Sequence, residues 1–113
     1  MLPLIIATLM TIAPGTAAPP IDATTIQGAH VTTQNLKGKV VMVDFWATWC
    51  GPCVKSLPLY QAMRERYAVA GLEVLAISID DELPNLQRFV TANKLTLPII
   101  HDRDKRLVKA FSP

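Results

Sequence analysis

The sequence predicts an α/β domain in which a parallel core sheet is flanked by helices. Three apolar runs of strand length cover residues 40–46, 73–79 and 97–101. Each run is followed by a segment with helical spacing of its apolar residues. This alternation is typical of parallel strands joined by right-handed crossovers. A chain of 113 residues has room for one such domain.

The first predicted elements lead up to the first buried strand. Residues 19–39 are polar and rich in threonine, with weak alternation, so we expect a short hairpin or an extended lead-in. Residues 40–46 form a nearly continuous apolar run, which predicts a strand buried on both faces. Asp44 is the single charged residue in this run, which is unusual for a buried strand.

Helices and strands alternate through the rest of the chain. Residues 52–69 have helical spacing, Pro58 predicts a kink within that helix, and Gly71 ends it. Residues 73–79 are the second strand, and the acidic run 80–82 favours the start of a helix that ends near residue 93. Residues 97–101 are a short third strand, after which Asp102 or Asp104 caps a last helix.

Composition excludes two broad classes of protein. Half of the residues are hydrophobic and only 18% are charged, which excludes an intrinsically disordered chain. Eleven basic residues against nine acidic ones leave a net charge of +2, which is far below the basic excess typical of a nucleic-acid-binding domain. We therefore expect no nucleic-acid partner, and we expect a monomer.

The amino-terminal segment predicts export. No charged residue precedes Asp22, and residues 2–13 are almost wholly apolar. This run is too short to span a bilayer, which needs about 20 residues, but it suits a secretory signal peptide. We expect a signal peptide at 1–18, a domain at 19–113, and a periplasmic or otherwise exported protein with no transmembrane span. An amino-terminal strand and an uncleaved anchor are the alternatives.

The strongest chemical signal is the pair Cys50 and Cys53, which stand where the first strand gives way to the first helix. Cysteines at positions i and i+3 of a helix are close enough for a disulfide. The helix amino terminus favours an anion, so we expect Cys50 to be the nucleophile with a lowered thiol pKa. Cys53, one turn further in, can then attack the sulfur of Cys50 and resolve a mixed disulfide. Gly51 allows another backbone to approach, and Pro52 suits the first helical turn.

Redox exchange has three alternatives as the use of the two cysteines: zinc binding, covalent haem attachment and an inert disulfide. Zinc requires four ligands, and only His30 and His101 could complete the set, without the usual ligand spacing. Covalent haem requires histidine directly after the second cysteine, where the chain has Val54. An inert structural disulfide stays open, although so small a loop gains little closure entropy. We expect redox exchange, with no metal and no organic cofactor.

Residues 43–53, Val-Asp-Phe-Trp-Ala-Thr-Trp-Cys-Gly-Pro-Cys, together with Pro58, resemble the active-site segment of the thioredoxin superfamily. The variant around Trp46 and Trp49, the upstream run 38–41 and the run 56–58 resemble its exported, TlpA-like branch. The resemblance spans residues 21–113 and implies a thioredoxin-like fold.

The resemblance also assigns roles. It implies that Cys50 is the nucleophile, that Cys53 is the resolving thiol, and that Trp49 docks substrate, with Gly51 and Pro52 beside it. Asp44 matches the buried acid of thioredoxins. A lone carboxylate in an apolar strand should have a raised pKa, which suits proton exchange with Cys53. The alternative is that Asp44 merely bonds a lysine or the backbone.

The resemblance implies an exported thiol-disulfide oxidoreductase that reduces protein disulfides and serves redox homeostasis or cytochrome c maturation. An upstream thiol electron donor would reduce its own disulfide again after each reaction. The family pattern continues with a cis-proline loop, two antiparallel strands and a helix, none of which follows Pro98 here, so we expect the domain to lack its carboxyl-terminal part. The alternatives are a non-catalytic truncated fragment and a binding module with a silent CxxC.

Overall fold

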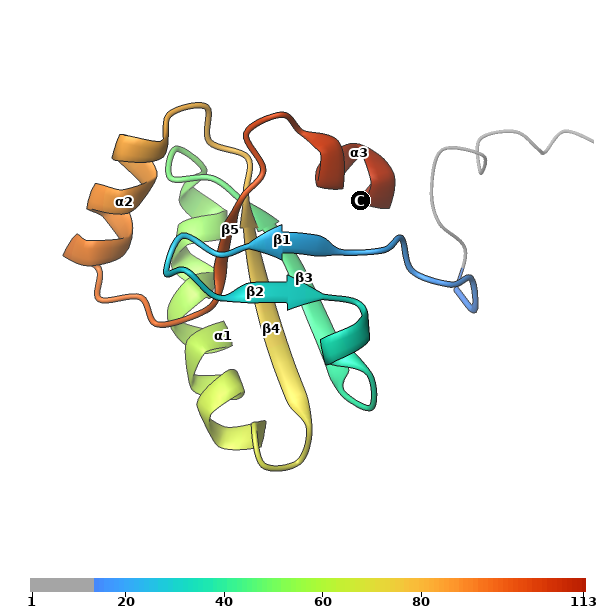
Figure 1. The fold of residues 1–113 in the computed structure, drawn as a ribbon. Coiled ribbons are helices and arrows are strands. Elements are labelled where there is room, and N and C mark those ends of the chain that lie inside the picture. Colours follow the sequence, from blue (N-terminus) through green and yellow to red (C-terminus); the bar gives the residue numbers. More distant parts are fainter. Residues whose placement is uncertain (1–13) are drawn as a thin grey trace, which may run out of the picture.

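The computed structural model describes residues 14–113, and its centre is a parallel sheet of three strands (Figure 1). The strands are β3 (Val40–Trp46), β4 (Leu72–Ser78) and β5 (Ile99–His101), in the order β3-β4-β5. In the register of the sheet, Val43 lies beside Leu75, and Ile77 lies beside Ile100. The predicted α/β class and parallel core are confirmed.

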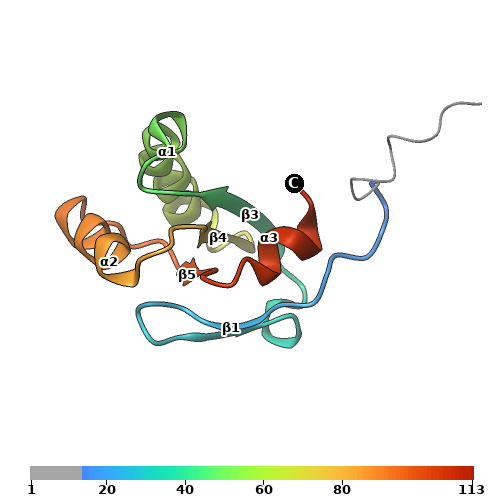
Figure 2. The ribbon, with the colours of Figure 1, turned by 90° about the horizontal axis from the view of Figure 1, so that it is seen from above.

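The two faces of the sheet carry different elements (Figure 2). On one face lie α1 (Gly51–Tyr67) and α2 (Leu83–Ala92). On the other lie an antiparallel hairpin and α3 (Arg106–Phe111). The hairpin consists of β1 (Asp22–Thr24) and β2 (His30–Thr32), and a 3-10 helix, η2 (Gln34–Leu36), follows it. The lead-in is therefore a hairpin.

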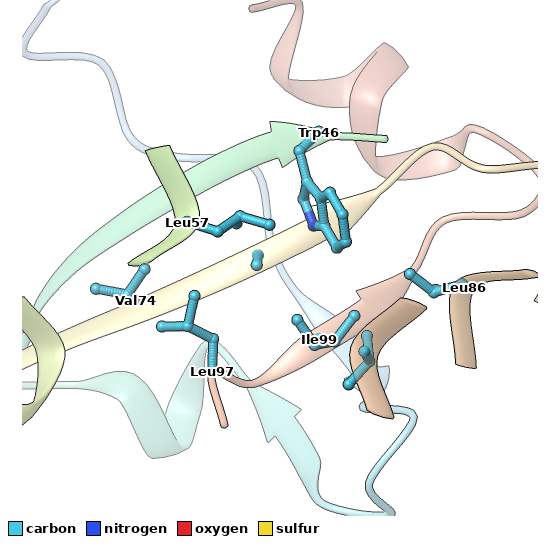
Figure 3. Packing of buried hydrophobic residues seen from close by; sticks show 8 residues of the cluster. Trp46, Leu57, Val74, Leu86, Leu97 and Ile99 are labelled. Carbon is cyan, nitrogen blue, oxygen red and sulfur yellow. The ribbon is translucent and has the colours of Figure 1, made fainter. Parts of the chain in front are cut away.

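Each face of the sheet has its own hydrophobic core. Toward α1 and α2, the buried side chains include Trp46, Leu57 and Leu86, which gather in Figure 3. Toward the hairpin and α3, the core includes Ile100 and Leu107. Side chains alternate across a strand, so β4 supplies residues to both cores.

The expectation that residues 40–46 are buried on both faces was wrong. Only Trp46 in β3 is fully buried, Val40 is exposed, and the residues between them are half-buried. Within residues 14–113, β3 pairs with β4 alone, so it is an edge strand. The strand that is paired on both edges and buried along most of its length is β4.

Other boundaries shift by a residue or two. The third strand is shorter than expected, because residues 97–98 precede β5. Gly71 adopts a positive φ of 100° in the turn between α1 and β4, a conformation that glycine adopts readily. Most of the expected signal peptide (residues 1–13) lies outside the described residues. Across residues 14–113, every helix is too short or too polar to cross a bilayer.

Candidate active site

The loop after β3 delivers Cys50 to the start of α1. Cys50 is the N-cap residue, with an extended backbone, and Gly51 begins the helix. The carbonyl oxygen of Cys50 accepts the first helical hydrogen bond, at 3.0 Å, from the amide of Val54. Pro52 stands in the first turn, where no amide donor is needed. The thiol therefore sits where free helical N–H groups stabilise an anion.

Cys50 and Cys53 are joined in a disulfide, with their Cα atoms 5.3 Å apart. Both residues are half-buried, and Cys53 packs against the core beneath α1. The residues around Cys50 are open to solvent: Trp49 is 71% exposed, and Gly51 and Pro52 are exposed as well. The structure thus brings the predicted docking residues and the outer cysteine to one accessible surface.

Asp44 lies in β3 between Met42 and Trp46 along the strand, on the face that α1 covers, which is also the face of Cys53. Its Oδ2 is buried and has no hydrogen-bond partner among the described residues. Burial raises the pKa of this carboxyl above its ordinary value of 3.8. The group is therefore more readily protonated than an exposed aspartate.

Sequence reasoning missed Asp80. The acidic run 80–82 was expected to serve the start of α2, but the carboxylate of Asp80 turns away and accepts hydrogen bonds from the active-site loop at Thr48. Glu82 is the N-cap residue of α2 and makes no side-chain cap bond. No local signal could have revealed a contact across 32 positions.

The histidines lie elsewhere. His30 is in the hairpin and contacts Asp22 at 2.6 Å. His101 ends β5, and its Nε2 bonds the carbonyl oxygen of Asp80. In the part of the chain that the structure describes, no three His, Cys, Asp or Glu side chains gather as metal ligands would.

Comparison with known proteins places this geometry in a family. The model of the AhpC/TSA family matches residues 14–112. The chain belongs to the AhpC/TSA family. The thioredoxin-like resemblance of its sequence is confirmed at the level of fold. The thiol-disulfide oxidoreductase ResA of Bacillus cereus is 31% identical over 98 residues, which are 87% of this chain and 57% of that protein. ResA of Geobacillus thermodenitrificans is 30% identical over 100 residues. The chain spans less than two thirds of the length of these relatives.

Solved structures of similar proteins share the fold. A thiol:disulfide interchange protein of the thioredoxin family from Chlorobium tepidum superimposes with a TM-score of 0.77 at 29% identity, covering 89% of this chain and 69% of that one. StoA from Bacillus subtilis gives a TM-score of 0.72 at 28% identity, covering 82% and 71%.

Proposed function

We propose that this chain is a thiol-disulfide oxidoreductase that reduces disulfides of proteins outside the cytoplasm. The observation that carries the proposal is the position of Cys50: it caps α1, lies within disulfide distance of Cys53, and stands beside an exposed tryptophan. Relatives with 30–31% identity are named thiol-disulfide oxidoreductases, which supports the same activity.

The proposed reaction begins with the reduced dithiol. The thiolate of Cys50 attacks one sulfur of a substrate disulfide, the substrate S–S bond breaks, and a mixed disulfide forms while the other substrate sulfur leaves as a thiolate and takes up a proton. Cys53 loses its proton and attacks the sulfur of Cys50. The mixed disulfide then breaks, the second substrate thiol leaves, and the Cys50–Cys53 disulfide remains. Two electrons have passed to the substrate, and an upstream thiol donor restores the dithiol.

We assign supporting roles to two neighbours. Asp44, whose raised pKa comes from burial and whose Oδ2 is unpaired, takes the Cys53 proton as that thiol attacks. Trp49, with Gly51 and Pro52 beside it, offers the surface on which the substrate backbone docks. The apolar segment 2–13, with the small residues that follow it, supports export.

Trapping of the intermediate tests the proposal. Cys53→Ser should hold insulin, used as a disulfide-bonded probe, in a stable mixed disulfide on Cys50, whereas Cys50→Ser should hold none. Non-reducing gels and mass spectrometry of the cross-linked peptide identify the sulfur. Trp49→Ala should slow insulin reduction while the equilibrium of the dithiol with glutathione stays as in the parent. Trapping by both serine variants, or by neither, would refute the proposed order of attack.

A further inference from the structure

The carboxylate of Asp80 is buried against the loop that carries the dithiol. Asp80 is only 3% exposed. The amide of Thr48 donates to both of its oxygens, at 3.2 and 3.1 Å, and the Thr48 hydroxyl donates to Oδ1 at 2.6 Å. The Ser78 hydroxyl donates to Oδ2 at 2.5 Å. Both oxygens of this carboxylate therefore act as hydrogen-bond acceptors, and among the described residues every partner is a donor.

These bonds hold the middle of a loop whose ends are already tied. At its start, the carbonyl oxygen of Trp46 accepts the amide of Ile79 at 2.9 Å. At its end, the amide of Cys50 donates to the carbonyl oxygen of Ala47 at 3.1 Å and closes a tight turn. Thr48 lies inside that turn. The Asp80 side chain therefore bonds a residue in the middle of the turn that leads to Cys50.

A second layer holds Asp80 itself. His101 Nε2 bonds the Asp80 carbonyl oxygen at 2.7 Å, and the backbone amide of Asp102 donates to the carbonyl oxygen of Ser78 at 2.8 Å. The adjacent Asp81 turns outward and pairs with Lys105 at 3.0 Å. The titratable groups that these bonds bring near Asp80 thus come from β5, from the loop between β5 and α3, and from its own loop. None of them makes a hydrogen bond to its carboxylate.

We propose that Asp80 is a positioning residue for the dithiol: it fixes the turn before Cys50 and holds its carboxylate against Thr48, two residues before the nucleophile. This inference rests on the proposed function. The helix amino terminus stabilises the Cys50 thiolate, whereas a buried like charge opposes it. Because a destabilised thiolate destabilises the reduced form, Asp80 makes the dithiol a stronger reductant.

Asp80→Asn separates the charge from the geometry. The amide oxygen of asparagine can accept the Thr48 donors, and its NH₂ can donate to Ser78, so the turn is kept. In the reduced 113-residue chain, the pH midpoint of Cys50 alkylation by iodoacetamide should fall. The equilibrium with glutathione should move toward the dithiol by about threefold, or about 14 mV.

Asp102→Asn is the matched control. Asp102 is also 3% exposed and also accepts only donors, but these are the amides of Leu107 and Val108 at the start of α3. Its substitution should lower the urea midpoint of unfolding and leave the alkylation midpoint where the parent has it. A general effect of losing a buried carboxylate would shift both variants alike.

Thr48→Val gives a test of opposite sign. It removes the hydroxyl donor from the Asp80 carboxylate and keeps the carboxylate itself. Because one donor fewer then offsets the negative charge, the pH midpoint of Cys50 alkylation should rise. Superimposed alkylation curves of the parent, Asp80→Asn and Thr48→Val would overturn the inference. If Asp80→Asn fails to fold, as judged by far-UV circular dichroism, Thr48→Val alone decides. The proposed function fails on a separate result: a parent disulfide that does not equilibrate with glutathione.

Discussion

Replacing Asp44 with asparagine should stabilise the oxidised protein at neutral pH. Burial without a hydrogen-bond partner penalises an ionised carboxylate more than a neutral amide of the same shape, and because Asp44 is only half-buried we take the difference as about 1 kcal/mol. In a domain of this size, that corresponds to a rise in Tm of about 4–8 °C. The neutral amide removes the charge that burial penalises.

The effect should depend on pH with a definite sign. Burial raises the pKa of Asp44 in the folded state above its unfolded value of 3.8. The protonated carboxyl therefore contributes its full stability below pH 3.8, and this contribution is lost as the pH rises through the pKa of the folded state. The Tm advantage of Asp44→Asn should therefore be greatest at neutral pH and disappear toward pH 3.8.

The assay is thermal unfolding followed by circular dichroism, with parent and variant compared at each pH so that all other titrations cancel. Glu65→Gln, which neutralises an exposed carboxylate on α1, is the control and should show no comparable trend. An advantage of equal size at every pH, or a loss of Tm at neutral pH, would refute the assignment of a destabilising charge to Asp44.

Two further predictions concern the framework of the site. Leu57→Ala, at a residue of α1 that is 1% exposed, should cost about 2–5 kcal/mol in urea unfolding. Leu59→Ala, at a residue of the same helix that is 61% exposed, should change stability by less than about 0.5 kcal/mol, and equal costs would contradict the assigned core. For Glu73, burial opposes ionisation, but the hydrogen bonds from Arg64 at 2.6 Å and from the Val74 amide prevail and lower its pKa. Glu73→Gln should therefore lose about 1 kcal/mol at neutral pH, a deficit that shrinks as the pH falls below the unfolded value of 4.5; a deficit independent of pH would exclude the ionised pair as its cause.

Local pattern predicted most of the framework. The apolar run 40–46 coincides with β3, and the cysteines stand at the start of α1 because the strand ends where glycine and proline begin a helix. The raised pKa of Asp44 could be expected from one charge within an apolar strand. Each of these features depends on residues that are neighbours in the sequence.

The features that sequence reasoning missed depend on tertiary neighbours. Residues 40–46 are as apolar as a central strand, yet β3 lies at an edge of the described sheet, and hydropathy carries no information about which strand lies between the others. Asp80 is adjacent to a helix start, and this local signal concealed its bond to Thr48. A buried carboxylate so placed can be recognised only once β3 and β4 lie side by side.

The central position of β4 has a consequence for how the molecule opens. Val74 and Ala76 face one core, Leu75 and Ile77 face the other, and all four are fully buried. Neither core can lose its packing without exposing one side of this strand, so the two should unfold as a single cooperative unit. In native-state hydrogen exchange, the amides of β4 should share the highest protection and report the global unfolding free energy. The hairpin, which contributes few buried residues, should open at lower cost and leave that unit intact.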